Sequence, residues 1–242
     1  MTTNYRSAHL GGVADAFSAT DHADFKPTGA FTVGAWFKTT VAAAQNFSQS
    51  SAYTSSKLSG WWLVITAAGL VEFGSAKNTG QSYPTDYGQS SSGVTAYKDG
   101  LWHWAVGVYD GAHLNLYVDA VLCSDIQAWT SAPVYQATNY VRVGNGSDTG
   151  DSYNFFNGNL DEVFVINGTA WNQATVTSYY KHYITGATNL KAYYQFEDVL
   201  TDSSGFGHTL TAIGSPTFQN NVPFTQATTN YLNEVRRGSS TI

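Results

Sequence analysis

The stretch WHWAVGVYDGAHLNLYVD at residues 102–119 constrains the fold more than any other part of the chain. Apolar and polar residues alternate on both sides of Asp110 and Gly111, and this period of two is the pattern of a half-buried strand. Asp-Gly is favoured in the tight turn whose twist matches two antiparallel strands. The stretch therefore predicts a β-hairpin.

The same alternation recurs along much of the chain. Residues 31–38 place Phe31, Val33, Ala35 and Phe37 on one face of a strand. Further strands are expected between turn-forming residues, at 5–11, 14–19, 61–66, 70–75, 140–144, 160–167, 189–197 and 207–213. Only 172–183 has a helical pattern, with Asn172 as a cap.

Two polar segments dotted with aromatic residues, 45–60 and 78–97, are predicted to be long loops. Loops of this length in a compact domain are functional or disordered. From residue 219 the chain loses its periodicity, so 219–242 is expected to be a C-terminal arm.

Composition narrows the function classes. The chain has 242 residues, a net charge of −6 and no basic stripe, which argues against a nucleic-acid partner. The longest apolar runs, such as 61–65, fall far short of the roughly 18 residues that a membrane helix needs, so no membrane partner is expected. Residues 1–17 lack a basic segment followed by an apolar one, and no Sec-type export signal is expected.

Four segments in order resemble the laminin G-like domains of the concanavalin A-like lectin superfamily. They include DGLWHWAVGVYDGAHLNLYVDAVL at 99–122 and FFNGNLDEVFVINGTAW at 155–171, and the others span 10–38 and 190–218. Ala120 stands where such domains usually have Gly. The resemblance implies an all-β fold, a two-sheet antiparallel jelly-roll sandwich with one short helix, over residues 1–218.

Two adjacent carboxylates, Asp161 and Glu162, suggest chemistry in the segment 154–171. Glycoside hydrolysis needs two carboxyl groups about 5–9 Å apart across the scissile bond. Neighbours in a regular strand point to opposite faces, so this pair is not expected to be catalytic. The E-x-D-x-x-E strand motif of laminarinase-type relatives is also absent. Asp161 and Glu162 are therefore predicted to be structural and hydrogen-bonded, and the protein is predicted not to be an enzyme.

Calcium is the one cofactor that the sequence suggests, because hard oxygen ligands bind it. One candidate site holds Asp198, Asp202 and Ser204, in a loop similar to the D-x-S-G-x-G-N loop of related domains, although His208 replaces the last Asn. The other candidate site holds Asp148 and Asp151. The alternative at both places is an ordinary turn in which these side chains bond their own backbone.

Glycan binding is suggested by aromatic residues among Ser, Gly and Asn, since tyrosine supplies large contact area at low entropic cost. The candidates are Tyr53, Tyr83, Tyr87, Tyr97, Trp129, Tyr135 and Tyr153. The alternative is that several of these rings pack on the edges of the sandwich.

The preferred function is a non-catalytic structural or recognition module on a virion surface, as capsid decoration or tail fibre, made in the host cytoplasm. Its expected partners are other subunits, contacted through the termini, and glycans. The alternatives are a free or cell-surface carbohydrate-binding adhesion protein and, third, a glycoside hydrolase. Fold resemblance does not decide among these classes.

Overall fold

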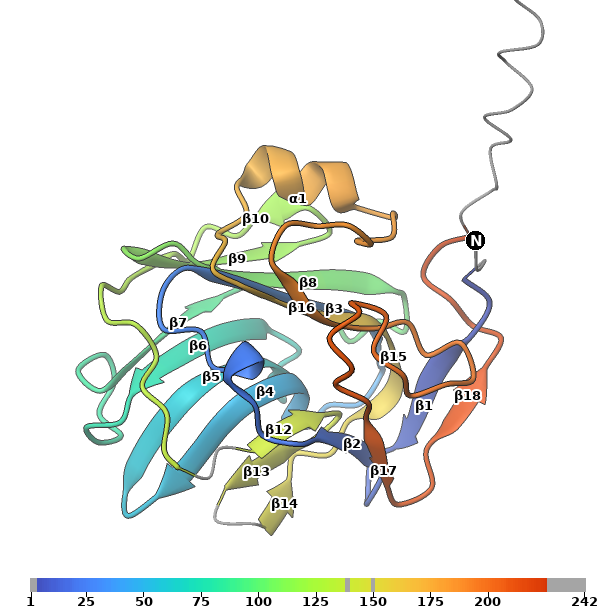
Figure 1. Cartoon of the computed structure of the whole chain (residues 1–242), viewed down its shortest axis with the longest axis horizontal. Coiled ribbons are helices and arrows are strands. Elements are labelled where there is room, and N and C mark those ends of the chain that lie inside the picture. Colours follow the sequence, from blue (N-terminus) through green and yellow to red (C-terminus); the bar gives the residue numbers. More distant parts are fainter. Residues whose placement is uncertain (1–3, 138–139, 149–150, 226–242) are drawn as a thin grey trace, which may run out of the picture.

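Two antiparallel sheets face each other in the computed structural model, which describes residues 4–137, 140–148 and 151–225 (Figure 1). The larger sheet has nine strands, in the order β10 (Val121–Leu122), β9 (His113–Val118), β8 (His103–Tyr109), β3 (Phe31–Lys38), β15 (Asn157–Asn167), β1 (Ser7–Gly11) and β18 (Thr217–Gln219), with β11 (Gln127–Ala128) paired to β9 and β16 (Leu190–Tyr194) paired to β15.

The second sheet has seven strands, in the order β17 (Thr211–Ile213), β2 (Ala16–Ala19), β12 (Tyr140–Val143), β4 (Gln45–Thr54), β5 (Lys57–Ile65), β6 (Val71–Lys77) and β7 (Tyr87–Ser91). A small separate hairpin joins β13 (Gly146–Asp148) to β14 (Asp151–Tyr153). The helical elements are the 3₁₀ turn η1 (Ala23–Phe25) and the helix α1 (Gln173–Tyr179). No helix among the described residues is long and apolar enough to cross a membrane.

The predicted hairpin is present as β8 and β9. Asp110 Oδ1 accepts hydrogen bonds from the backbone N–H groups of Ala112 and His113, and Gly111 has φ +95°. The predicted helix begins after Asn172, whose side chain accepts a hydrogen bond from Thr175 N at 2.9 Å. The all-β jelly-roll sandwich is thus confirmed.

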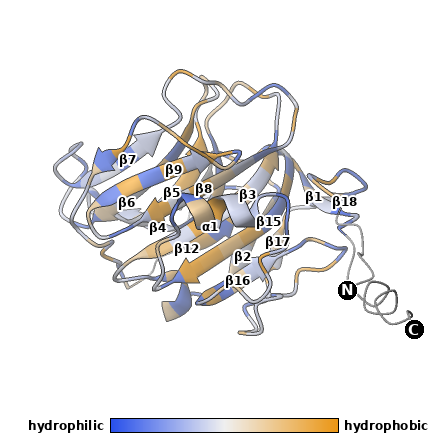
Figure 2. Cartoon of the chain, turned by 90° about the horizontal axis from the view of Figure 1, so that it is seen from above, coloured by the Kyte–Doolittle hydropathy of each residue, from blue (hydrophilic) through white to orange (hydrophobic). Residues whose placement is uncertain are grey.

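The main core lies between the two sheets. The four residues expected on one face of β3, Phe31, Val33, Ala35 and Phe37, are all buried in it. From the other sheet, Trp61 and other alternate residues of β5 point inward to meet them. Hydrophobic residues are concentrated in the central strands of the molecule (Figure 2).

A second apolar cluster, the outer cluster, covers the other face of the nine-stranded sheet. Its rings come from strands far apart in the sequence, from α1 and its surroundings and from the C-terminal segment; they include Trp36, Trp104, Phe164, Trp171, Tyr193 and Phe224. Trp36 lies 6.1 Å from Trp104 and 5.8 Å from Phe224, measured between ring centroids. The helix α1 sits on this side of the sandwich (Figure 1).

The prediction of a loop at 45–60 is wrong, because β4 and β5 form a hairpin there. The strand β4 carries polar side chains on both faces, and buried Ser48, Ser50 and Gln49 give it no apolar alternation. The segment 78–97 is only partly a loop, since it contains β7. Pairing with an apolar neighbouring strand holds both segments in the sheet. The alternation of apolar and polar residues within one segment does not reveal such pairing.

The start of the segment expected to be an arm lies against the sandwich. The strand β18, at 217–219, pairs with β1, and Phe224 is buried in the outer cluster. Residues 226–242 of that segment lie outside the described part of the chain.

Candidate functional site

The outer face of the seven-stranded sheet presents side chains that alternate with the core. In β5, Trp61 and Leu63 are buried between the sheets, whereas Trp62 and Val64 point away from it. In the register of the sheet, Trp62 lies opposite Gln49 of β4 and opposite Gly74 of β6. Strand pairing thus brings residues from distant segments onto one open face.

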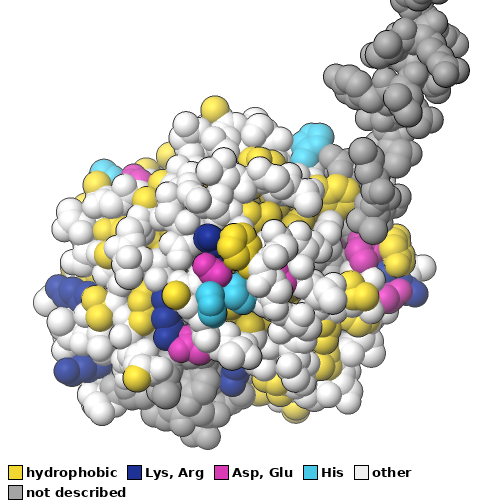
Figure 3. Space-filling view, in the orientation of Figure 1, with side chains coloured by type: hydrophobic (Ala, Val, Ile, Leu, Met, Phe, Trp, Pro, Cys, Tyr) yellow, Lys and Arg dark blue, Asp and Glu magenta, His cyan; other side chains and the backbone are white. Residues whose placement is uncertain are grey.

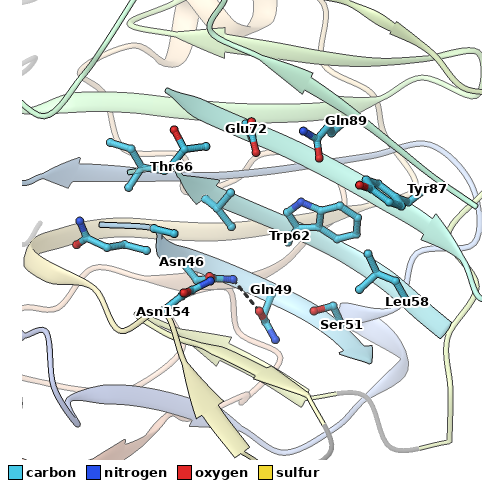
Figure 4. Close-up of a pocket in the computed structure, with 14 residues that line it drawn as sticks. Asn46, Gln49, Ser51, Leu58, Trp62, Thr66, Glu72, Tyr87, Gln89 and Asn154 are labelled. Carbon is cyan, nitrogen blue, oxygen red and sulfur yellow. Dashed lines mark hydrogen bonds between the residues drawn. The ribbon is translucent and has the colours of Figure 1, made fainter. Parts of the chain in front are cut away.

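A groove of about 300 Å³ lies on this face (Figure 4). That volume is at the lower end of ligand pockets, which span about 300–1,000 Å³. The labelled lining residues come from β4, β5, β6, β7 and the positions beside them: Asn46, Gln49, Ser51, Leu58, Trp62, Thr66, Glu72, Tyr87, Gln89 and Asn154.

The indole of Trp62 occupies the middle of the groove (Figure 4). It lies flat against Gly74, where a Cβ atom would overlap the ring. Tyr87 meets Trp62 edge-on at 5.9 Å, and Tyr83 continues the series at 5.5 Å from Tyr87. Glycine at 74 thus lets a tryptophan lie along the sheet as part of an aromatic platform.

Side-chain amides surround this platform. Asn46 Nδ2 donates to Gln49 Oε1 at 2.8 Å, as the dashed line in Figure 4 shows. The backbone N–H of Asn46 donates to the carbonyl of Asn154 at 3.0 Å, which fixes one end of the groove. Gln89 lines the opposite side. An amide offers both donors and an acceptor, and that mixture is complementary to hydroxyl groups.

Glu72 is the one carboxylate among the described residues that line the groove. Burial, followed by the negative charge of Asp125, raises the pKa of Glu72 above its ordinary value. No lysine or arginine is found in that same lining. The electrostatics of the groove therefore disfavour an anionic ligand.

Three of the predicted aromatic candidates lie on this face. Tyr87 lines the groove, Tyr83 packs beside it and donates to Gln127 Oε1 at 2.7 Å, and Tyr53 sits opposite Leu58 in the β4–β5 register. These three residues come from segments predicted to be loops, and the sheet brings them together.

The other aromatic candidates lie elsewhere. Trp129 is only 6 % exposed and belongs to the main core, and Tyr135 packs against it with its hydroxyl bound to Pro27 O. Tyr97 packs edge-on against His103 at 4.8 Å. The side chain of Tyr153 lies outside the described part of the structure. For Trp129, Tyr135 and Tyr97, packing against the sandwich describes the structure better than ligand contact does.

Sequence reasoning missed Trp62, Asn46 and Gln49. The pair Trp61-Trp62 carried a signal, because adjacent residues of a strand face opposite ways and one of two neighbouring tryptophans must leave the core. Nothing comparable marks Asn46 or Gln49, since their place depends on the pairing of β4 with β5.

At the first proposed calcium site, the carboxylate of Asp202 accepts hydrogen bonds from its surroundings. Its donors are the backbone N–H groups of Tyr193, Ser204 and His208 and the hydroxyl of Ser204, at 2.8–3.1 Å. Asp198 instead pairs with Arg6 at 3.0 Å. The side chains of Asp148 and Asp151, the second proposed site, lie outside the described part. Calcium binding stays a prediction at both places.

Asp161 and Glu162 do not point to opposite faces, and the expectation from simple alternation is wrong. The register of β15 against β3 shifts between Asp161 and Phe164, and Glu162 has φ +51°. A bulge inserts one extra residue into a strand and bends it locally. Leu160 and Val163 both enter the main core, and the two carboxylates between them share Asn4 Nδ2, at 3.1 and 3.4 Å.

This acidic group is deeply buried. Asp161 is 0 % exposed and Glu162 is 4 % exposed, and burial raises the pKa of both carboxyls well above their ordinary range. The hydroxyl of Tyr193 donates to Glu162, and Asp161 Oδ1 accepts from the backbone N–H of Glu162. Nearby, burial raises the pKa of Glu197 to about 7, although Tyr5 N and Arg6 N donate to it. The group joins the N-terminal segment to β15.

Residues 10–196 match the family model described as the concanavalin A-like lectin/glucanases superfamily. The chain belongs to this superfamily. A search among curated proteins found no match to this lectin-like chain.

Solved structures share the fold of this lectin-like sandwich at low sequence identity. A Bacteroides ovatus protein for which carbohydrate binding has been proposed is 14 % identical, with a TM-score of 0.65 over 92 % of this chain, which spans 62 % of that protein. A heptameric SAP-like pentraxin from Limulus polyphemus is 13 % identical, with a TM-score of 0.59 over 91 % of this chain and 97 % of its own.

A third solved structure is the CBM40 domain of the Ruminococcus gnavus IT-sialidase bound to α2,6 sialyllactose. It is 11 % identical, with a TM-score of 0.53 over 73 % of this chain and 97 % of its own.

Proposed function

We propose that the chain is a non-catalytic module that binds a neutral glycan in the groove of the seven-stranded sheet. The observation that carries the proposal is the indole of Trp62, held flat on Gly74 in the middle of an open, amide-lined groove. Ligand pockets combine aromatic walls with a few placed polar groups that fix orientation. A sugar ring has an apolar C–H face for the indole and hydroxyls for the partly exposed amide of Gln89. Asn46 and Gln49, 4 % and 1 % exposed, form a polar wall of the groove.

The charge of the groove selects among sugars. Glu72 is its one carboxylate among the described residues, and no lysine or arginine lines it there. A sialylated glycan carries a carboxylate, which would be placed near Glu72 without a compensating cation. A neutral sugar brings no negative charge near Glu72, whose pKa is already raised by burial and by Asp125.

The number of carboxylates in the groove supports glycan binding over glycan cleavage. Hydrolysis by the common mechanisms uses two carboxyl groups flanking the scissile bond, and the described lining holds one. The comparisons add support at the level of fold, since carbohydrate binding is proposed for the Bacteroides ovatus protein and the CBM40 domain holds sialyllactose.

The test is an array of neutral and sialylated glycans probed with the wild-type chain, Trp62→Ala and Tyr87→Ala. The control is Phe206→Ala, an aromatic residue that is 52 % exposed and lies outside the groove. The wild type and the control are expected to bind neutral glycans, and loss of one stacked ring typically costs on the order of tenfold or more in affinity.

Binding of no glycan by the wild type, or unchanged binding by Trp62→Ala, would contradict the proposal. A preference for sialylated glycans would contradict the neutral class. Release of reducing ends from a bound glycan, abolished in Glu72→Gln, would show an enzyme instead.

Assembly on a virion surface stays a prediction, as does the alternative of a cell-surface adhesion protein. Both place the groove on an exposed protein that holds a glycan. Mass spectrometry of purified particles, compared with that of the cell envelope, distinguishes the two locations.

A further inference from the structure

Three polar side chains converge where the turn η1 meets the loop that follows β16. They are His22 and Asp24 from η1 and its cap, and His208 from the loop. Candidate ligand atoms of the three residues all lie within 4.8 Å of one another. Histidine side chains gather beside acidic and basic ones near the middle of the face seen in Figure 3. The cluster shares no residue with the groove.

Two of the three distances between candidate ligand atoms are close to those of a metal site. Tetrahedral zinc with bonds of about 2.0–2.1 Å places its donor atoms roughly 3.3 Å apart. Asp24 Oδ2 is 3.2 Å from His22 Nδ1 and 2.8 Å from His208 Nε2. The first pair already has the required spacing, and the second must open by roughly 0.5 Å.

The two imidazoles present different atoms to an ion. The backbone N–H of Asp24 donates to His22 Nδ1 at 3.2 Å, so this nitrogen presents a lone pair, and a metal ion would replace that long hydrogen bond. His208 Nε2 lies 2.8 Å from Asp24 Oδ2 and donates to it, so a bound ion would displace the proton of this nitrogen. The two imidazole rings lie 4.6 Å apart between centroids and are tilted by 47°.

Two of the ligands are largely buried and the third is accessible to solvent. The side chains of His208 and Asp24 are 11 % and 17 % exposed, whereas that of His22 is 53 % exposed. An ion can therefore reach the cluster from solvent and meet a carboxylate that already contacts His208. Lys191 Nζ lies 3.8 Å from the other oxygen of Asp24, so its charge competes with the ion and moderates the affinity.

We propose that His22, Asp24 and His208 form a binding site for a late first-row divalent cation, of which zinc is the representative. Imidazole nitrogens select zinc and its neighbours, whereas calcium and magnesium require oxygen ligands. The ion ties η1 to the C-terminal loop, joining Asp24 to a residue 184 positions away. The bound metal then stabilises the folded chain, because the unfolded chain does not hold the three ligands together.

The test uses the full chain without a histidine tag, dialysed against a chelator and titrated with zinc chloride by calorimetry and thermal unfolding. The test variants are His22→Ala and His208→Asn, the second restoring the residue that related loops carry. The matched control is His113→Ala, which removes a histidine that is 49 % exposed and pairs with Asp110 in another part of the chain.

One zinc ion per chain and a raised melting temperature are expected for the wild type and the control. Both test variants should bind zinc at least about tenfold more weakly, since each loses a ligand. Absence of saturable zinc binding, or equal affinity in the wild type and the two test variants, would overturn the site. An equal effect of calcium that His208→Asn abolishes would overturn the class of ion.

Discussion

The outer faces of the two sheets differ in what covers them. The nine-stranded sheet buries its outer face under α1 and the C-terminal segment, where Trp36 and Trp104 form part of a second apolar cluster. The seven-stranded sheet leaves Trp62 partly exposed among amides in a groove. Tryptophan thus serves packing on one face and is presented to solvent on the other, and the covering segment, not the residue type, sets the difference.

The largest effect is expected on the covered face. Trp104→Ala removes a buried ring from the outer cluster and should lower the free energy of unfolding by about 3–5 kcal/mol, measured by urea denaturation. The control, Leu101→Ala, changes a side chain that is 61 % exposed and should stay within about 0.5 kcal/mol of the wild type. An equally small effect of Trp104→Ala would mean that the covered face is not a core.

The buried carboxylates of the covered side predict a pH dependence. Burial raises the pKa of Glu197 from 4.5 to about 7, so the folded state binds this proton more tightly than the unfolded state does. The stabilisation is complete below about pH 4.5 and is lost as the pH rises toward 7, a fall of roughly 1–3 kcal/mol. Glu197→Gln should make this slope shallower in urea denaturation from pH 4.5 to 7. Asp161 and Glu162, whose pKa burial also raises, contribute the slope that remains.

At still lower pH the free energy of unfolding is expected to fall as the pH falls. Burial alone would raise the pKa of Asp99 and Asp110. Hydrogen bonds from Leu101 N and His103 to Asp99, and from Ala112 N, His113 N and Asn115 to Asp110, together with the nearby histidine charges, outweigh burial and lower the pKa of both carboxyls below the ordinary value. Their stabilisation is lost as the pH falls through those lowered values. Stability that rises steadily from pH 4.5 to 7 in the wild type would contradict the assignment to Glu197.

A substitution on the open face should weaken glycan binding and change the free energy of unfolding only slightly. Gly74→Ala places a Cβ where the indole of Trp62 rests, so the ring must lift from the sheet. With the glycan found on the array, calorimetry should show an affinity loss of about tenfold, which corresponds to about 1.4 kcal/mol. Gly29→Ala, which adds a Cβ in open space, is the matched control. Unchanged affinity in Gly74→Ala would show that the ring does not form the platform.

The smallest expected effect is a gain in stability at the turn between β9 and β10, beside the covered face. Asp119 and Ala120 turn the chain from β9 to β10 with φ +52° and +63°, a conformation that favours glycine. Ala120→Gly should raise the free energy of unfolding by about 0.5–1 kcal/mol, because it removes this strain. Asp119→Gly is a contrasting variant, since it also removes the carboxylate that binds Trp104 N and His103. A loss of stability in Ala120→Gly would show that the contacts of its methyl group outweigh the strain.

The sequence by itself determined the elements that show a clear period. The strands β3, β8 and β9 and the inward set beginning with Phe31 follow from alternation, and the cap Asn172 follows from local chemistry. Tyr83 and Tyr87 were predicted from composition, because a tyrosine among small polar residues can be recognised in the sequence whether the segment forms a loop or a strand. These features depend on neighbours within a few positions.

Only the tertiary structure decided where the groove and the acidic group lie. The polar strand β4 is held by its pairing with β5, the bulge in β15 places Asp161 and Glu162 on one side, and His208 meets Asp24 across most of the chain. Each depends on strand register or on a contact between distant segments. A shift of one residue in register moves every side chain of a strand to the opposite face, and local sequence period does not contain that information.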